Sequence, residues 1–349
     1  MSPPRVFVHE FVTGGGWPLG EVPFDLASEA AAMLRAVLAD FSAWGAVRTV
    51  TTLDRRLDHF TLPADEVMSV VPGQHASAFS ALLDHSDAAL VIAPETDGVL
   101  ARLSASAEEA GIPLLSCSSA AVAIASDKAR CYDLFRQASL PTPVTRRSSF
   151  STASQAADQV GYPVVIKPID GVGCEGVCLV REPAELADAL TLVHQATSHD
   201  GIILQSFVAG VHASVSLLVA GEQSLPLSLN GQAIEVGCPF VYRGGAVPLS
   251  HPLAARALTV AQSAVRLIPG LRGYVGVDVI LTQDEALLIE INPRLTTSYI
   301  GLRQVIDLNL AQAIWGARFR GTLPSQVRLS GQVSFTKDQL RHALTREAA

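Results

Sequence analysis

The chain has 349 residues, of which 49% are hydrophobic and 17% charged, so it can bury a large core and is unlike a disordered protein. This length favours two or three packed units. The net charge is −8 and no run of lysine and arginine is longer than a pair, which argues against a nucleic-acid partner. No apolar run approaches the roughly 18 residues that cross a bilayer. The N-terminus has no signal-peptide core, so we expect a cytoplasmic protein that does not enter membranes.

Residues 1–116 have the alternating pattern of a small doubly wound α/β domain. A glycine-rich loop at 10–16 follows the first apolar run. The predicted strands are 5–9, 47–51, 66–71 and 88–93, and the predicted helices are 27–41, 76–84 and 97–110.

The rest of the chain predicts an α+β organisation. Residues 117–149 form a helical connection, whose main helix is capped by Asp127 and runs to Ala138. Residues 150–210 read as helix, strand, glycine loop, strand, helix and strand, which makes a small lid. Residues 211–349 form a C-terminal domain with an antiparallel sheet. Its predicted strands are 213–220, 225–229, 275–281 and 286–291, and its predicted helix is 252–268.

The five cysteines are an odd number and show no CxxC spacing, so neither a disulfide framework nor a zinc site is expected. Cys174 and Cys178 are interpreted as core or loop thiols.

Lysine is rare in this chain. Lysine and arginine together number 25, and the only lysines are Lys128, Lys167 and Lys337. A compact ammonium grips a phosphate differently from the planar guanidinium fork, so each lysine in an arginine-rich chain is a candidate for a specific role.

Lys167 ends an apolar run at 164–168, and a loop with Gly171, Gly173 and Gly176 separates it from a second run at 177–180. Glycines let backbone N–H groups approach an anion closely. The loop is not a Walker loop, because the GK[ST] ending is absent, and it opens a strand where a Rossmann loop opens a helix. A long hairpin with an exposed lysine is the alternative.

Lys128 lies in the first turn of its helix, where the helix dipole opposes a cation and an anion would be attracted by both. Taken alone, it is an exposed lysine.

The segment 276–294 predicts a hairpin with Asp278 on one strand and Glu290 and Asn292 on the other. Glu290 and Asn292 are two apart and share a face. Carboxylates among apolar residues need a cationic partner, and oxygen ligands suit Mg²⁺. Arg294 follows the hairpin, and its guanidinium can form two parallel hydrogen bonds to a phosphate or a carboxylate. Buried carboxylates paired with nearby arginines are the alternative.

Residues 202–214 read as an apolar strand running into an open segment, which can offer backbone groups to an adenine edge. His212 in this segment is more often a packed or solvated histidine than a catalytic one.

In this order, the pieces resemble the ATP-grasp superfamily, and the resemblance covers nearly the whole chain. It implies ATP and Mg²⁺ (or Mn²⁺) as cofactors and ligation of a carboxylate to an amine through an acyl phosphate. It also implies that Glu290 bridges two ions and that Lys167 and Arg294 act in catalysis. The implied nucleotide residues are Lys128, Lys167, Gly171, Gly173, Gly176, Gln205, Phe207 and Val208, and the implied metal ligands are Asp278, Glu290 and Asn292.

One feature departs from the family pattern. Where many members carry a glutamate that binds the ribose or adenine side, this chain has His212-Ala213-Ser214. The resemblance therefore does not assign the ribose contacts.

More narrowly, segments 10–16 (EFVTGGG), 93–97 (APETD) and 292–299 (NPRLTTSY) resemble the tyramine–glutamate ligases of methanofuran and methylofuran biosynthesis. This resemblance implies L-glutamate as donor, tyramine or tyrosine as acceptor, and a γ-glutamyl amide. The candidate substrate residues are Glu10, Gly14, Gly15, Glu95, Arg243 and Gly244.

Four other functions are weighed against this one. They are ligation of another amino-acid pair, phosphoryl transfer without an amine, a nucleotide-binding regulator without turnover, and a dinucleotide oxidoreductase. The intact acidic set disfavours the regulator, and the missing GxGxxG spacing disfavours the oxidoreductase. The expected partners are small molecules, and the sequence leaves a homodimer open.

Overall fold

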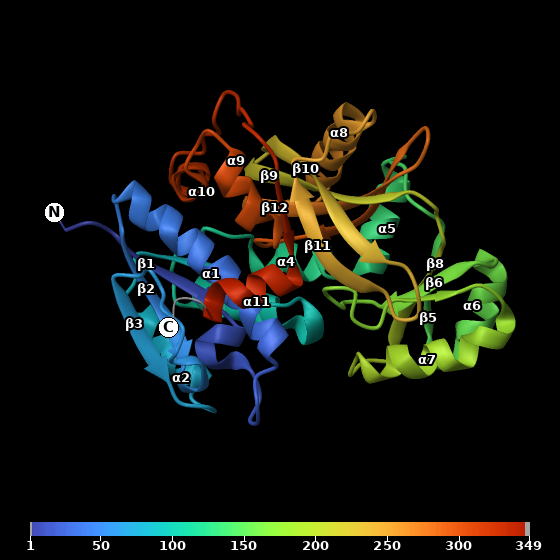
Figure 1. Cartoon of the computed structure of the whole chain (residues 1–349), viewed down its shortest axis with the longest axis horizontal. Coiled ribbons are helices and arrows are strands. Elements are labelled where there is room, and N and C mark those ends of the chain that lie inside the picture. The colour runs from blue at the N-terminus through green and yellow to red at the C-terminus, as the bar shows by residue number, and fades with distance from the viewer. Residues whose placement is uncertain (1, 346–349) are drawn as a thin grey trace.

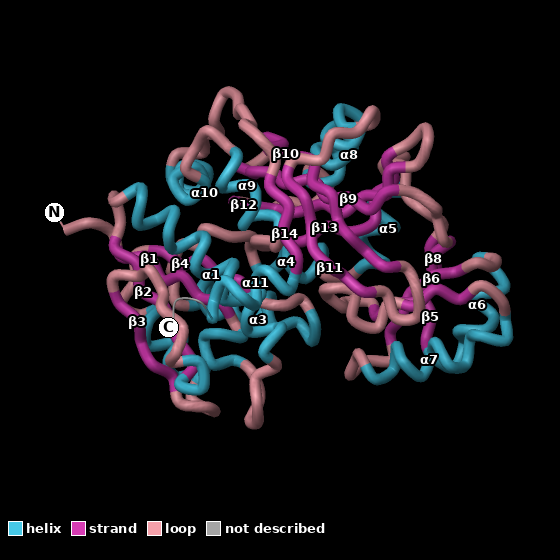
Figure 2. Tube along the Cα trace, viewed as in Figure 1, coloured by secondary structure: helices cyan, strands magenta, loops and turns pink. Residues whose placement is uncertain are grey.

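The computed structural model describes residues 2–345, which form three sheets with helices packed around them (Figures 1 and 2). The strands are β1 (Arg5–Glu10), β2 (Arg48–Asp54), β3 (Glu66–Val70), β4 (Ala88–Ile92), β5 (Thr145–Ser149), β6 (Val164–Pro168), β7 (Cys178–Val180), β8 (Gly201–Ser206), β9 (Val211–Ala220), β10 (Gln223–Glu235), β11 (Val241–Val247), β12 (Gly273–Leu281), β13 (Ala286–Asn292) and β14 (Val333–Thr336). The α-helices are α1 (Phe24–Trp44), α2 (His75–Leu83), α3 (Val99–Glu109), α4 (Ser119–Ala125), α5 (Lys128–Gln137), α6 (Ala153–Val160), α7 (Leu186–Gln195), α8 (Ala254–Val265), α9 (Ser298–Val305), α10 (Leu310–Phe319) and α11 (Lys337–Thr345). None of these described helices is long and apolar enough to span a membrane.

The N-terminal sheet is parallel and has the order β3-β2-β1-β4. Successive side chains of a strand point to opposite faces, and β1 follows this rule. Val6 and Val8 pack in the cluster that contains Leu34 of α1, whereas Phe7 packs in the cluster that contains Phe79 of α2. Helices therefore cover both faces, and the predicted α/β domain is confirmed.

The lid is a second sheet, antiparallel, in the order β5-β8-β6-β7 (Figure 1, green). Ala157 of α6 and Val193 of α7 pack against Val164 and Leu204 on one face of this sheet. β5 was not predicted, because its sequence, Thr-Arg-Arg-Ser-Ser, has no apolar side chain that would signal a strand.

The largest sheet has the order β13-β12-β9-β10-β11-β14. Helix α8 packs on one face and helices α9 and α10 pack on the other. β11, β14 and helices α9 to α11 were not predicted. The glycine pair in β11 weakens its strand signal, and β14 is only four residues long.

The cysteine prediction is wrong for one pair. Cys178 of β7 and Cys238, which lies between β10 and β11, form a disulfide across 60 residues of sequence. The backbone N–H of Phe240 donates to the carbonyl of Val177, and that of Leu179 donates to Gly237, so the two segments run side by side. Local spacing cannot reveal a pair that the fold brings together. Cys117, Cys131 and Cys174 are free thiols.

Candidate active site

A pocket lies between the lid sheet and the largest sheet. The space inside it, with its open mouth included, is about 740 Å³. The predicted residues on its wall are Lys128, Lys167, Gly171, Gly173, Gln205, Phe207, Val208, Asp278 and Glu290. Sequence motifs that are up to about 160 residues apart therefore meet at one cavity.

One end of the pocket is apolar, with walls that include Phe207, Val208 and Ile280. Gln205 is buried, and its side-chain Nε2 donates to the Thr145 hydroxyl at 2.8 Å, so β5 fixes its orientation. The backbone N–H of Phe207 donates to the carbonyl of Pro163. Apolar walls beside an amide of fixed orientation suit an aromatic base.

The other end holds the two lysines. Asp127 caps α5 by accepting from the N–H groups of Ala129 and Arg130, which sets Lys128 in the first turn as predicted. The Lys128 ammonium donates to the Gly171 carbonyl at 2.6 Å and lies 3.3 Å from a carboxylate oxygen of Glu290. The helix start, the glycine loop and the acidic hairpin therefore converge on one ammonium.

The charges at this end are tightly coupled. Burial alone would lower the pKa of Lys128, but Glu290 and then Glu95 raise it above its usual value. Burial lowers the pKa of Lys167, and Lys128 lowers it further, against the influence of Glu290. Two buried ammonium groups that share one carboxylate make a strong anion site.

The acidic hairpin has the predicted form. β12 and β13 pair antiparallel with Asp278 opposite Glu290 and Gly276 opposite Asn292, and a bulge follows Asp278. The side chain of Gln232, on β10, donates to Asp278 at 3.1 Å.

This carboxylate pair fits a divalent cation. Burial, and then the charge of Glu290, raises the pKa of Asp278 to about 7. Burial alone would raise the pKa of Glu290, but Lys128 and Lys167 outweigh it and lower that pKa. Asn292 also hydrogen bonds to Asp278, so an amide and two carboxylates gather where Mg²⁺ would find oxygen ligands.

Arg294 and Glu95 form a buried pair beside the hairpin. The Arg294 Nε donates to Glu95 Oε2 at 3.0 Å, and its Nη1 donates to the Leu295 carbonyl. Among the described residues, the second oxygen of Glu95 is buried without a hydrogen-bond partner. A buried acceptor without a partner is costly, so this oxygen is suited to a ligand's ammonium.

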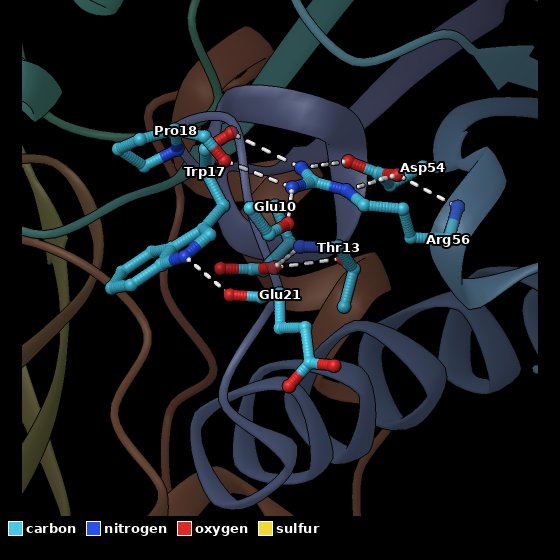
Figure 3. Close-up of polar contacts among 8 residues, drawn as sticks. Glu10, Thr13, Trp17, Pro18, Glu21, Asp54 and Arg56 are labelled. Atoms are coloured by element: carbon cyan, nitrogen blue, oxygen red, sulfur yellow. Dashed lines mark hydrogen bonds and ion pairs between the residues drawn. The ribbon is translucent and has the colours of Figure 1, made fainter.

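Glu10 is already occupied by its own loop. Its carboxylate accepts from the N–H of Val12 at 3.1 Å and from both the N–H and the hydroxyl of Thr13 at 2.7 Å (Figure 3). Burial raises its pKa against these hydrogen bonds. Glu10 therefore holds the turn that contains Gly14 and Gly15. Gly15 has a φ of 93°, which a side chain rarely adopts.

The next part of this loop is held by Arg56. Its guanidinium donates to Asp54 and to the main-chain carbonyls of Trp17 and Pro18 (Figure 3).

Arg243 and Gly244, the other two predicted substrate residues, lie on β11. The Arg243 side chain is 62% exposed and pairs with Glu235 at 2.7 Å. A Cβ on Gly244 would lie 2.1 Å from the Phe335 carbonyl oxygen, so this glycine permits the close approach of β14. Neither residue lines the pocket.

Residues 125–298 match the ATP-grasp domain and residues 47–122 match the pre-ATP-grasp 3 domain. These two stretches include the lysine helix, the lid and the acidic hairpin in the order predicted. The chain is an ATP-grasp domain protein.

Relatives of this ATP-grasp domain protein include two tyramine–L-glutamate ligases. The one from Methanocaldococcus jannaschii is 35% identical over 63% of the chain and 59% of its own length. The one from Methanocaldococcus fervens is 38% identical over 62% of the chain and 62% of its own length. Each match thus spans about three-fifths of the relative.

Among solved structures, one from Archaeoglobus fulgidus described as an ATP-grasp superfamily protein has a TM-score of 0.67 and is 29% identical. The match covers 90% of this chain and 88% of that one. The likeness supports the ATP-grasp fold across all three sheets.

Several wall residues of the ATP-grasp pocket were not predicted. Gln232 and Ile234 come from β10, and Phe240 comes from the segment beside the disulfide. These residues belong to no glycine loop or acidic motif, so the sequence carried no signal for them. His212 also lines the pocket, and burial, then Lys167, lowers its pKa.

Proposed function

We propose that this protein is an ATP-dependent ligase that joins L-glutamate, through its γ-carboxylate, to an aromatic amine such as tyramine or tyrosine. The observation that carries the proposal is the meeting of Lys128, Lys167 and Glu290 at one end of an apolar pocket, with the Arg294–Glu95 pair alongside. The names of the two ligase relatives support the choice of substrates. A place in methanofuran or methylofuran biosynthesis is part of the same proposal.

In the first step, a carboxylate oxygen of the donor attacks the γ-phosphorus of ATP, and the bond to the β-phosphate oxygen breaks to release ADP. Catalysis of such a transfer is mostly positioning and neutralisation of charge. Lys128 and Lys167 hold the phosphates, while Gln205, Phe207 and Val208 hold the base and the 170–176 loop covers the triphosphate. Arg294 orients the attacking carboxylate.

A divalent cation, held by Asp278, Glu290 and Asn292, would supply positive charge at the phosphoryl group when bound. Lys128 and Lys167, whose charges act on Glu290, would neutralise the charge that develops on the phosphates.

In the second step, the amine nitrogen attacks the acyl carbon, the bond from that carbon to the phosphate oxygen breaks, and phosphate leaves. The acceptor enters as an ammonium, so it releases one proton to solvent before it attacks, and the nitrogen passes a second proton to the departing phosphate as the amide forms. The unpaired oxygen of Glu95 supports the binding of the incoming ammonium, because it is buried beside Arg294.

Mass spectrometry of the products from ATP, Mg²⁺ and a mixed pool of amino acids and amines tests the proposal. We expect a γ-linked amide of glutamate, and ADP release that depends on glutamate and on an aromatic amine. If another donor such as D-alanine releases ADP and glutamate does not, the substrate assignment is wrong. ADP release that requires no amine would favour a phosphotransferase.

A further inference from the structure

The third lysine of the chain, Lys337, is not used by the nucleotide site. It is the first residue of α11, directly after β14, at the edge of the largest sheet. Because β14 pairs with β11 and Gly244 lets the two strands approach closely, the start of α11 is brought next to Tyr242. The Lys337 ammonium lies 5.6 Å from the centre of the Tyr242 ring.

Lys337 also pairs with a residue from the opposite end of the chain. Its ammonium is 3.4 Å from one carboxylate oxygen of Glu29, on α1. The other oxygen of Glu29 accepts from the Thr297 hydroxyl at 2.6 Å. Thr297 is three residues after Arg294, so the Glu29–Lys337 pair is attached to the segment that carries Arg294.

The segment that follows β13 places this pair near the proposed site of phosphoryl transfer. Arg294, which pairs with Glu95, and Thr297, which donates to Glu29, lie three residues apart in this segment. The Glu29–Lys337 pair is therefore held by the same segment as the arginine that is proposed to orient the attacking carboxylate.

The pair is also accessible. The side chain of Glu29 is 21% exposed and that of Lys337 is 35% exposed, whereas Lys128 has 9% of its side chain exposed. An ion pair with this much exposure contributes little to stability, so a ligand can replace it at small cost.

We propose that Glu29 and Lys337 form the subsite for the α-amino-acid end of the donor, with the α-ammonium on Glu29 and the α-carboxylate on Lys337. This inference rests on the proposed function and goes beyond it by assigning the residues that select the donor. An α-amino acid carries both charges on one carbon, and the pair presents the two opposite charges side by side.

The assignment also accounts for a side-chain amide. With the α-carboxylate held at Lys337, the γ-carboxylate is the one left to reach Arg294 and the γ-phosphate. The α-carboxylate is kept from the phosphoryl group, so the acyl phosphate forms at the γ-carboxylate.

Donor analogues that each lack one charge test the two contacts separately. 4-Aminobutyrate is glutamate without the α-carboxylate, and glutarate is glutamate without the α-ammonium. Initial rates of ADP release would be measured for all three donors, at saturating ATP and tyramine, for the wild type, Lys337→Met and Glu29→Gln. Calorimetry would give the dissociation constant of glutamate in the presence of a non-hydrolysable ATP analogue.

In Lys337→Met, we expect kcat/KM for glutamate to fall by about 10- to 100-fold, the loss typical of a hydrogen bond to a charged group. The kcat/KM for 4-aminobutyrate should stay within about twofold of the wild-type value, because this donor has no α-carboxylate to bind the Lys337 ammonium. In Glu29→Gln, kcat/KM should fall for glutamate and change little for glutarate, which has no α-ammonium, so the ratio of the two values should decrease. The KM for ATP should not change in either variant.

Asp338→Asn is the matched control, because Asp338 is the next residue of α11 and forms its ion pair with Arg341 of the same helix. It should leave donor preference unchanged. Lys337→Arg keeps the charge and should retain part of the preference, and melting temperatures identify any variant that fails to fold.

Equal losses for all three donors in Lys337→Met, or no loss for glutamate, would overturn the subsite. If the wild type releases no ADP with glutamate, the donor assignment fails and the subsite fails with it. If the wild type turns over glutamate and both variants keep its donor selectivity, the subsite is overturned and the proposed function stands.

Discussion

The two ends of the site are built differently. At the proposed nucleotide end, Lys128 and Lys167 are almost completely buried, and their partners on the pocket wall belong to short continuous motifs. At the proposed substrate end, the groups come from α1, the segment after β4, the segment after β13 and the start of α11. Glu29 and Lys337 at that end are also more exposed.

This difference follows from what each end has to hold. A triphosphate carries the same charges in every ATP-dependent reaction, so one arrangement of lysines, glycines and carboxylates serves many proteins. A donor and an acceptor differ between reactions, and residues on separate elements can change without disturbing the phosphate contacts. Substitutions at the nucleotide end should therefore abolish turnover, and those at the substrate end should change selectivity.

The largest effect is expected for Glu290→Gln. The change keeps the shape of the side chain and removes the charge that Lys128 and Lys167 share, so Mg²⁺-dependent kcat should fall by at least about 10³. ADP release and melting temperature would be measured together. Glu235→Gln, on an exposed carboxylate, is the control. A Glu290 variant that loses thermal stability and keeps its activity would show a structural ion pair instead.

Lys167→Met should have the next largest effect. Loss of an ammonium at the phosphates should weaken ATP binding and lower turnover by at least about 10², or about 2.7 kcal/mol of transition-state stabilisation. Lys167→Arg should restore little, because a planar fork does not replace a point charge in a buried space. Unchanged dependence on ATP concentration in the Met variant would contradict the assignment.

A stability effect with pH should come from the N-terminal domain. His9 is fully buried, its Nδ1 contacts the Thr52 hydroxyl, and its Nε2 lies 3.0 Å from His75. Burial, and then His75, lowers the pKa of His9 well below 6.5. Above pH 6.5 both the folded and the unfolded chain carry a neutral His9. As the pH falls below 6.5, only the unfolded chain takes up the proton, so the folded state loses stability.

The slope should approach about 1.4 kcal/mol per pH unit for one such histidine. Unfolding by denaturant between pH 7.5 and 5.5 would measure it, and His9→Gln should flatten the slope. An equal slope in the variant would assign the effect to another group. The raised pKa of Glu10 acts with the opposite sign, because protonation favours its folded form.

The smallest effect is expected for Arg243→Ala. The side chain is exposed and pairs with Glu235, so the free energy of unfolding should change by about 0–1 kcal/mol. If Arg243 contacts a carboxylate of the substrate, Arg243→Ala should raise the KM for the donor and leave the KM for ATP unchanged. Unchanged values for both would limit Arg243 to its surface ion pair.

The sequence by itself predicted the residues that meet at the proposed nucleotide end of this protein. The glycine loop, the capped lysine helix and the Asp278–Glu290 hairpin are each local, because a turn, a helix start and a two-stranded register are specified by residues close in sequence. Their order along the chain carried the resemblance that implied the ATP-grasp fold, and the three sheets confirm that fold. The alternation of apolar runs with helical spacing likewise predicted the parallel N-terminal sheet.

Only the tertiary structure decided the rest. The Cys178–Cys238 disulfide, the β14 edge strand and the meeting of Glu29 with Lys337 join positions 60 to about 300 residues apart. Such contacts depend on how sheets and crossover helices pack, which local side-chain patterns do not specify. Lys337 was visible in the sequence as a rare residue, but its neighbours became known only when α11 was found beside α1 and β11.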